Sequence, residues 1–461
     1  MSRPLSRMVR MIMLALMLGL ATARPAIAQQ QGPSILRDTE TEVLFDQVAK
    51  PLVEAANLDP KSVKVVLLND PEINAFVAGS QNVYINSGLI TSSDNVNQFQ
   101  AVVAHELGHV AGGHAIRMGE GAKEATGITL ATMVLGAIAI AAGAGDAGLG
   151  LMMMGQQAAM GRFLAFTRAQ ETSADLAGAS YLSKAGISGK GSLEFFKKLQ
   201  NQEYRIAIYA KDSYDRTHPL SSERISILEN LYKKDPAWDK PTDPALEASF
   251  QRVKAKLVGF IDPKQAIRKY PETNQTVPAH YARAYAYHLG AYPEKALYEA
   301  DALLKTNPND PYFLELKGQI LLESGRPAEA IAPLREATER SGKAPLIASM
   351  LGHALISTED SKNYAEAKGI LKTAVAVDNE NPFAWYQLGM IYDREGDTPR
   401  AALATAERNN LEGNPKLALA SAEMAMRGIP ASSPDYLRAQ DIAMVSKNEL
   451  TKNKKGGRDR E

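Results

Sequence analysis

The chain contains 461 residues, of which 45% are hydrophobic and 23% are charged, and these proportions exclude a wholly disordered or collagen-like protein. Basic and acidic residues number 52 each, so the charge balance does not favour nucleic acid as a partner. Cysteine is absent, which excludes disulfides, thiolate zinc ligands, a cysteine nucleophile and a lipidated cysteine anchor. Any metal must therefore be held by histidine and carboxylate side chains.

Residues 1–28 have the pattern of a secretory signal peptide cleaved near Ala28. Three arginines precede a short apolar run, and small residues stand at the predicted cleavage site: Arg3, Arg7 and Arg10; Met11–Leu20; Ala26–Ala28. The apolar run is too short to span a bilayer comfortably, although a retained N-terminal anchor is the alternative. A leader without cysteine indicates a protein of the bacterial periplasm.

Residues 29–245 predict one α+β domain. The spacing of apolar residues indicates a helix over 39–56, a strand over 63–68, a hairpin formed by 74–77 and 83–86, and a helix that starts near Asn95. The strand Val83, Tyr84, Ile85 and Asn86 is a candidate edge strand that pairs with an extended substrate, and an internal strand is the alternative.

Residues 127–160 are unusually apolar and rich in alanine, glycine and methionine. A turn-like stretch at 143–148 divides them, so we expect two short apolar helices that close on each other. A buried hairpin is one interpretation. The other is an apolar lid or a hairpin that contacts a membrane, since methionine-rich surfaces adapt to varied partners.

The rest of the chain is helical in pattern, with a helical linker over 246–277, a repeat domain over 278–446 and a disordered tail over 447–461. Prolines recur at intervals of 33 to 37 residues from Pro278 to Pro382, which is the period of helix-turn-helix repeats. The last unit matches the tetratricopeptide pattern at Trp385, Leu388, Gly389, Tyr392 and Ala401. After Arg400 the phase is ambiguous, because the next helix can close one repeat or open another.

The segment His105-Glu106-Leu107-Gly108-His109 forms an H-E-x-x-H motif inside a helical pattern. Residues i and i+4 lie about 40° apart on a helix, so the two imidazoles can share one zinc ion. Glu106 faces the same opening without being a ligand, and there it can take a proton from water and pass it to a leaving amine.

Two places could supply a third ligand. His114 comes one residue too early for the H-E-x-x-H-x-x-G-x-x-H spacing and faces about 180° away from His105 on a continued helix, so a supporting or surface role is expected for it. Glu171 and Asp175 lie at i and i+4 of a predicted helix that ends at Gly186. Glu171 can then bind zinc while Asp175 orients a zinc-binding imidazole.

A third histidine of interest is His218, which stands in a predicted loop. It could stabilise the oxyanion of the reaction, occupy the open zinc position as a fourth ligand and latch, or serve the loop structurally. Arg224, six residues later, is expected to form an ion pair with a buried carboxylate.

These motifs together resemble the M48 family of zinc metallopeptidases over residues 40–235. The resemblance rests on the zinc helix, the E-x-x-x-D helix, the segment Thr217-His218-Pro219 with Glu223-Arg224, and the upstream residues Asn74-Ala75-Phe76 and Asn86-Ser87-Gly88-Leu89. It implies a zincin-type α+β domain, followed here by the all-α tetratricopeptide solenoid. It also implies one zinc ion per chain on His105, His109 and Glu171, with Glu106 and Asp175 as the catalytic and supporting carboxylates.

The chain as a whole is similar to periplasmic M48 members that carry tetratricopeptide repeats. The similarity implies a zinc endopeptidase in the quality control and assembly of outer-membrane proteins, with unfolded or stalled outer-membrane proteins as substrates. The repeats would bind the assembly machinery. The alternative is a chaperone-like or scaffold protein whose proteolysis is latent.

Overall fold

The computed structural model describes residues 34–79, 81–141, 145–206, 218 and 221–458. The predicted leader, residues 1–28, and the turn at Ser80 lie outside the described residues. No helix within the described part of the chain combines the length and the apolar character that crossing a membrane requires.

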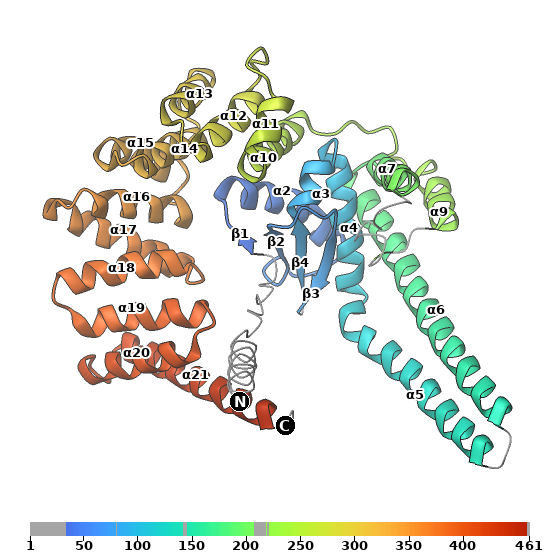
Figure 1. The fold of residues 1–461 in the computed structure, drawn as a ribbon. Helices are drawn as coiled ribbons and strands as arrows, with labels where there is room; N and C mark the ends of the chain where they lie inside the picture. The colour runs from blue at the N-terminus through green and yellow to red at the C-terminus, as the bar shows by residue number, and fades with distance from the viewer. Residues whose placement is uncertain (1–33, 80, 142–144, 207–217, 219–220, 459–461) are drawn as a thin grey trace, which may run out of the picture. The chain divides into compact units, whose positions relative to one another are not determined.

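A four-stranded mixed sheet forms the centre of the first domain (Figure 1). Its strands are β1 (Ile35–Leu36), β2 (Lys64–Leu68), β3 (Ala75–Ala78) and β4 (Asn82–Asn86), in the order β1-β2-β4-β3. β2 and β4 are parallel, whereas β1–β2 and β3–β4 are antiparallel. The predicted strand and hairpin are therefore confirmed.

The predicted edge strand is wrong, because Val83–Asn86 lies in β4, which pairs with β2 on one side and β3 on the other. β3 is the edge strand at this end of the sheet among the described residues. The sequence pattern could not show this, since both strands alternate similarly and the order of strands depends on the long-range pairing of β2 with β4.

Three helices pack with the sheet: α2 (Thr39–Ala55), α3 (Ser87–Ser92) and α4 (Val96–Ala111). Asn95 caps α4 by accepting a hydrogen bond from the Gln98 amide, which fixes the start of the helix one residue after the cap. Nearly all of α4 is buried. The ring of Phe99, on α4, packs between those of Phe45 and Phe250 in the core. This rigid packing positions the helix that carries the H-E-x-x-H motif.

The apolar segment belongs to two long antiparallel helices, α5 (His114–Ala141) and α6 (Gly145–Ala185), which pair with each other (Figure 1). They are longer than the two short helices that we expected, because α5 and α6 continue into the flanking metal-site segments without a break. Gly121 contacts Phe166 and Gly155 contacts Thr132, so small residues let the helices approach. Many apolar side chains nevertheless face outward, which excludes a buried hairpin in this structure: Leu130, Val134, Ile138, Leu149, Met153 and Met154.

Four further helices follow: α7 (Lys190–Ile206), α9 (Ser222–Tyr232), α10 (Pro244–Ile261) and α11 (Pro263–Lys269). The segment predicted as a linker packs against the first domain, because Phe250, Val253 and Leu257 of α10 join the core formed by the sheet and α2. Gly186, predicted to end the zinc-site helix, follows α6 with φ of +65°.

Ten helices then stack in five pairs within the described chain (Figure 1). The pairs are α12 (Val277–Leu289) with α13 (Pro293–Thr306), α14 (Pro311–Glu323) with α15 (Pro327–Arg340), α16 (Pro345–Ser357) with α17 (Tyr364–Val377), α18 (Pro382–Arg394) with α19 (Thr398–Leu411), and α20 (Pro415–Gly428) with α21 (Pro434–Arg458). A short 3-10 turn, η1 (Ser361–Asn363), lies between α16 and α17 in the third pair. The helix after Arg400 closes the fourth pair, which resolves the ambiguous phase.

The small residues that recur from one repeat to the next have a steric role. A Cβ at Gly318 would lie 2.4 Å from Leu334 Cγ, and one at Gly352 would lie 2.7 Å from Leu371 Cγ. Each glycine therefore allows the two helices of its unit to cross closely.

At the end of the chain, α21 remains helical to Arg458, so residues 447–458 are not the disordered segment that we predicted. Their lysine and glutamate residues favour a helix, and no proline interrupts it.

Buried charges connect the repeats to the first domain. Arg252 of α10 binds Glu40 of α2 at 2.7 Å and Asp310, the cap of α14, at 2.8 Å. Lys256 of α10 binds Asp38, and the Tyr281 hydroxyl of α12 donates to Glu40. Because removal of one partner would leave another charge buried and unpaired, this network favours a fixed arrangement of α2, α10, α12 and α14.

Candidate metal centre

The candidate site lies where α4 crosses α6. A Cβ at Gly108 would lie 2.6 Å from the carbonyl oxygen of Ala174, and one at Gly178 would lie 3.1 Å from that of Ala104. Glycine at both positions therefore lets the two backbones touch. This contact brings the histidines of the H-E-x-x-H motif to the carboxylates that come some 60 residues later.

Three donor atoms converge at this crossing. His105 Nε2 lies 3.1 Å from His109 Nε2 and 3.5 Å from Glu171 Oε2, and His109 Nε2 lies 3.4 Å from Glu171 Oε1. Ligands at about 2.0–2.1 Å from a tetrahedral zinc ion are separated by about 3.3 Å. The three side chains therefore have the donor types and the spacing that fit a tetrahedral metal ion.

His218 brings a fourth donor to the same cluster. Its Nδ1 lies 3.4 Å from His105 Nε2 and 3.2 Å from Glu171 Oε1, and the four donor atoms all lie within 4.8 Å of one another. Its Nε2 lies 3.1 Å from the carbonyl oxygen of Ala75 on β3. A carbonyl only accepts hydrogen bonds, so Nε2 donates to it, while Nδ1 faces Glu171 and the other donors of the cluster.

Asp175 supports the site from the side opposite the cluster. Its Oδ1 lies 3.0 Å from His105 Nδ1, which leaves Nε2 of that imidazole for the metal. Arg224 binds Asp175 through two nitrogens, at 2.6 and 2.9 Å, and reaches Glu171 Oε2 at 3.1 Å. The expected ion pair of Arg224 is confirmed, and it fixes two carboxylates at once.

Glu106 is the exception among the buried charges of the site. Its side chain is fully buried, and neither carboxylate oxygen accepts a hydrogen bond from any described residue. The Nε2 atom of His218 lies 3.5 Å away. A buried carboxylate that accepts no hydrogen bond from the described residues is costly, so this group is placed to accept one from a molecule bound beside the donor cluster.

His114 contacts a ligand without joining the cluster. Its Nδ1 lies 2.9 Å from His109 Nδ1, on the side of that imidazole which faces away from the other donors. The helix does not continue through Gly112 and Gly113, and Gly113 has φ of +61°, so α5 starts at His114 in a new direction. This break turns His114 back toward the motif, and the supporting role expected for it agrees with the contact.

The electrostatic balance prepares the cluster for a cation. Burial opposes the charged form of His105, but Asp175 and Glu171 raise its pKa to about 10. Burial would raise the pKa of Glu171, yet the surrounding imidazoles hold it well below its usual range. Burial and the neighbouring His109 lower the pKa of His114 to about 4, which keeps that imidazole neutral.

The sequence-predicted residues His105, Glu106, His109, Glu171, Asp175 and His218 thus meet at one place, whereas the strand Val83–Asn86 does not provide a free edge beside them. The nearby edge belongs to β3, where Ala75 contacts His218.

Replacement of His114 should weaken metal binding. In His114→Ala, His109 loses the acceptor for its Nδ1 proton, and loss of such a partner typically costs about 10–100-fold in metal affinity. His114→Asn keeps an acceptor near the Nδ1 position and should retain most of the affinity. Chelator competition against purified protein measures both, with Glu120→Gln, on the exposed face of α5, as the matched control. Equal affinities for His114→Ala and the unchanged protein would contradict the supporting role.

Comparison with known proteins agrees with the geometry. The pattern of peptidase family M48 matches residues 37–232, and that of the tetratricopeptide repeat matches residues 293–345 and 358–415. The beta-barrel assembly-enhancing protease of Yersinia pestis is 27% identical over 374 residues, which cover 78% of this chain and 74% of that protein.

Two relatives come from Escherichia coli (strain K12). Its beta-barrel assembly-enhancing protease is 27% identical over 299 residues, covering 62% of this chain and 59% of the relative. Its metalloprotease LoiP is 29% identical over 191 residues, covering 41% of this chain and 69% of the relative. The chain therefore carries a metallopeptidase domain of family M48, which contains the whole His105, His109 and Glu171 cluster, followed by tetratricopeptide repeats.

Proposed function

We propose that this protein is a zinc endopeptidase of the bacterial periplasm that acts in the quality control and assembly of outer-membrane proteins. The observation that carries the enzymatic part is the set of three donor atoms 3.1–3.5 Å apart beside the unpartnered carboxylate of Glu106. Two imidazoles with one carboxylate form a ligand set that catalytic zinc sites use, and a chain without cysteine cannot offer the thiolates of structural zinc sites.

When bound, zinc supplies a Lewis acid that polarises the scissile carbonyl and lowers the pKa of water. Glu106 removes a proton from the attacking water and delivers it to the leaving nitrogen. Asp175 and Arg224 hold His105 and Glu171 in place during the reaction, so that the ligands need not reorganise. The outer edge of β3 is the segment that can pair with an extended substrate backbone.

His218 supports a latched resting state. Its Nδ1 occupies the fourth corner of the donor cluster, the position that a catalytic zinc site keeps for water or substrate. Its Nε2 also forms a hydrogen bond with the carbonyl oxygen of Ala75 on the edge strand β3. One side chain therefore blocks both the metal and the start of the substrate strand, which favours latency. The same observation supports the alternative function, a chaperone-like or scaffold protein with occasional proteolysis.

The cellular role is inferred from several sources together. Residues 1–28 read as a leader, which supports export to the periplasm and lies outside the described residues. The relatives from Yersinia pestis and Escherichia coli (strain K12) are named for enhancing β-barrel assembly. Tetratricopeptide solenoids offer a continuous surface to polypeptide partners, which supports binding of the outer-membrane assembly machinery or of its unfolded substrates.

The α5–α6 hairpin supports peripheral contact with a membrane. Its outward side chains are predominantly apolar and are mostly more than half exposed, for example Val134 at 58%, Met153 at 71% and Met154 at 68%. Such a continuous apolar surface marks an interaction site rather than ordinary solvent exposure. A lid over the metal centre is the alternative use of the same hairpin.

Glu106→Gln should abolish cleavage while metal binding persists. The amide cannot accept the proton of water, and loss of a general base typically lowers the rate about 100–10,000-fold. Cleavage of unfolded casein and zinc content measure the two effects, and a chelator should stop cleavage by the unchanged protein. Undiminished cleavage by Glu106→Gln would refute the assigned base. Full cellular function of that variant would instead favour the scaffold alternative.

His218→Ala should raise casein cleavage, because the fourth position and the β3 edge become available together. We expect an increase of about tenfold if the latched state holds roughly nine tenths of the molecules. His288→Ala is the matched control, because His288 of α12 pairs with Glu323 and lies outside the metal centre. A fall in cleavage would show that His218 stabilises the transition state instead of blocking the site.

Polar substitutions on the hairpin should reduce binding to vesicles. The double variant Val134→Ser, Met153→Ser removes two exposed apolar side chains, and flotation with phosphatidylethanolamine–phosphatidylglycerol vesicles measures the bound fraction. Leu437→Ser with Met444→Ser alters equally exposed apolar residues on α21 and should leave binding unchanged. Equal flotation of all three proteins would contradict membrane contact by this hairpin.

A further inference from the structure

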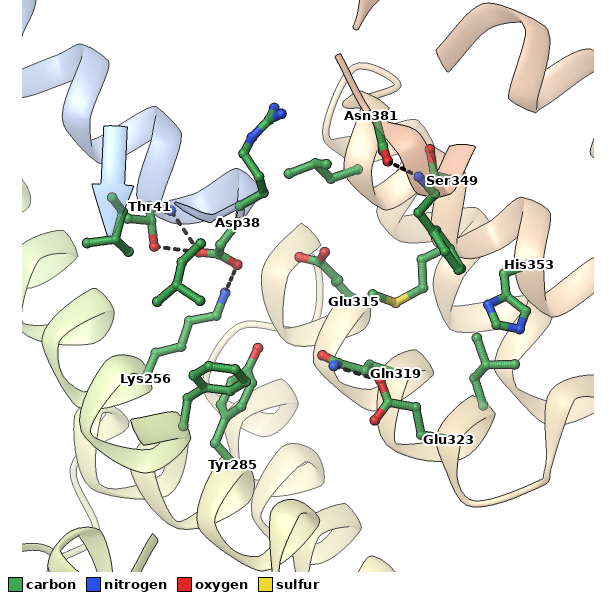
Figure 2. Close-up of a pocket in the computed structure, with 18 of the residues that line it drawn as sticks. Asp38, Thr41, Lys256, Tyr285, Glu315, Gln319, Glu323, Ser349, His353 and Asn381 are labelled. Carbon is green, nitrogen blue, oxygen red and sulfur yellow. Dashed lines mark hydrogen bonds and ion pairs between the residues drawn. The ribbon is translucent and has the colours of Figure 1, made fainter. Parts of the chain in front are cut away.

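A second cavity, of about 520 Å³, lies away from the metal centre. Its walls come from the ends of β1 and β2, the start of α2, α10 and α12 on one side, and from α14, α16 and α18 on the other (Figure 2). Cavities of this size hold small ligands or a few residues of a peptide. None of the metal-site residues lines it.

Most charged groups at this cavity already have partners within the chain. Lys256 pairs with Asp38 (Figure 2), and Arg37 pairs with Glu42 and with Asp378. Glu323 binds His288 at 2.7 Å and accepts a hydrogen bond from Gln319 at 2.9 Å. These groups satisfy one another and leave no charge that requires a ligand.

Glu315 differs from all of them. It is only 7% exposed, and its Oε2 atom is fully buried without a hydrogen-bond partner in the described residues. Figure 2 shows its carboxyl group directed into the open space between α10 and α16. Burial raises the pKa of Glu315 to about 8, although the nearby Lys256 opposes that rise. The described side chains thus leave this buried acid unsatisfied, at a cost in stability.

The remaining wall of the cavity is apolar and aromatic. Leu257 and Phe260 of α10 face Leu346 and Met350 of α16, with Phe383 from α18. Such a wall suits the aliphatic stem of a long basic side chain, and the aromatic rings can also face a cationic head group. A basic ligand allows Glu315 to ionise and form an ion pair, whereas a purely apolar ligand would leave the buried acid unsatisfied.

We propose that this cavity binds a lysine or arginine side chain of an extended polypeptide, with Glu315 as the carboxyl group that ionises beside the basic group and pairs with it. The repeats supply the surrounding surface for the polypeptide backbone. Binding here precedes and does not require hydrolysis. If this site binds no basic side chain, the proposed peptidase activity is unaffected. If the protein shows no peptidase activity, the proposal of this binding site is unaffected.

The test uses the full chain carrying Glu106→Gln, so that no probe is cleaved. Three fluorescent, N-acetylated peptides that differ only at a central lysine, norleucine or glutamate are titrated, and anisotropy gives the dissociation constants. The lysine peptide should bind about tenfold or more tightly than the norleucine peptide, since charge-assisted hydrogen bonds are the strong ones. The glutamate peptide should bind most weakly.

Adding Glu315→Gln should remove the preference for lysine, because the neutral amide keeps the shape but not the charge. Glu423→Gln, on the exposed side of α20 and outside the cavity, should keep it. The thermal midpoint of Glu315→Gln at pH 7.5 should equal or exceed that of the parent, because a buried unpaired acid has been removed.

Three results would overturn the site. Equal binding of the lysine and norleucine peptides by the parent protein would do so without any variant at Glu315. Persistence of the lysine preference in Glu315→Gln would place the basic side chain elsewhere. A clear fall in the thermal midpoint of Glu315→Gln would show that Glu315 is a structural group of the fold.

Discussion

The metal site depends on one steric constraint, the backbone contact between α4 and α6. Gly108 meets Ala174 at a distance that leaves no room for a Cβ, and Gly178 meets Ala104 at a distance that is tight for one. The two ligands on α4 are neighbours by helical geometry, but the third comes from a separate helix, so the spacing of the donor atoms is set by this crossing. A side chain at either glycine would move the carboxylate of Glu171 away from the imidazoles, even though it touches no ligand.

Buried charge is satisfied almost everywhere else in the described chain. Arg224 holds Glu171 and Asp175, and the network of Arg252 and Lys256 holds Asp38, Glu40 and Asp310. Among the described residues, the carboxylates with fully buried oxygens that accept no hydrogen bond are Glu106 and Glu315. Since such groups lower stability, their persistence in an otherwise well-paired protein points to functions outside folding. One stands at the metal centre, and the other stands in the cavity lined by the repeats.

The local features of this fold could be predicted from sequence because they repeat or carry distinctive chemistry. The H-E-x-x-H helix, the helix of Glu171 and Asp175, and the helix pairs that follow Pro278 were all indicated by spacing. The long-range pairing of strands could not be predicted in this way. The place of β4 inside the sheet depends on its parallel pairing with β2, in which each β2 residue precedes its β4 partner by 18 positions in the sequence. Glu315 gave no signal either, because a lone glutamate on a repeat helix is ordinary until its neighbours in space are known.

The position of His218 connects resting structure with substrate choice. In the proposed latched state the imidazole holds two contacts, one at the metal corner and one at the Ala75 carbonyl. A ligand shifts such an equilibrium only by its difference in affinity for the two states. A short peptide replaces one contact, whereas an extended chain can replace both, by pairing with β3 while its carbonyl enters the metal corner. The latch therefore favours long, unfolded polypeptides over fragments, without requiring any preference for particular side chains at the cleavage site.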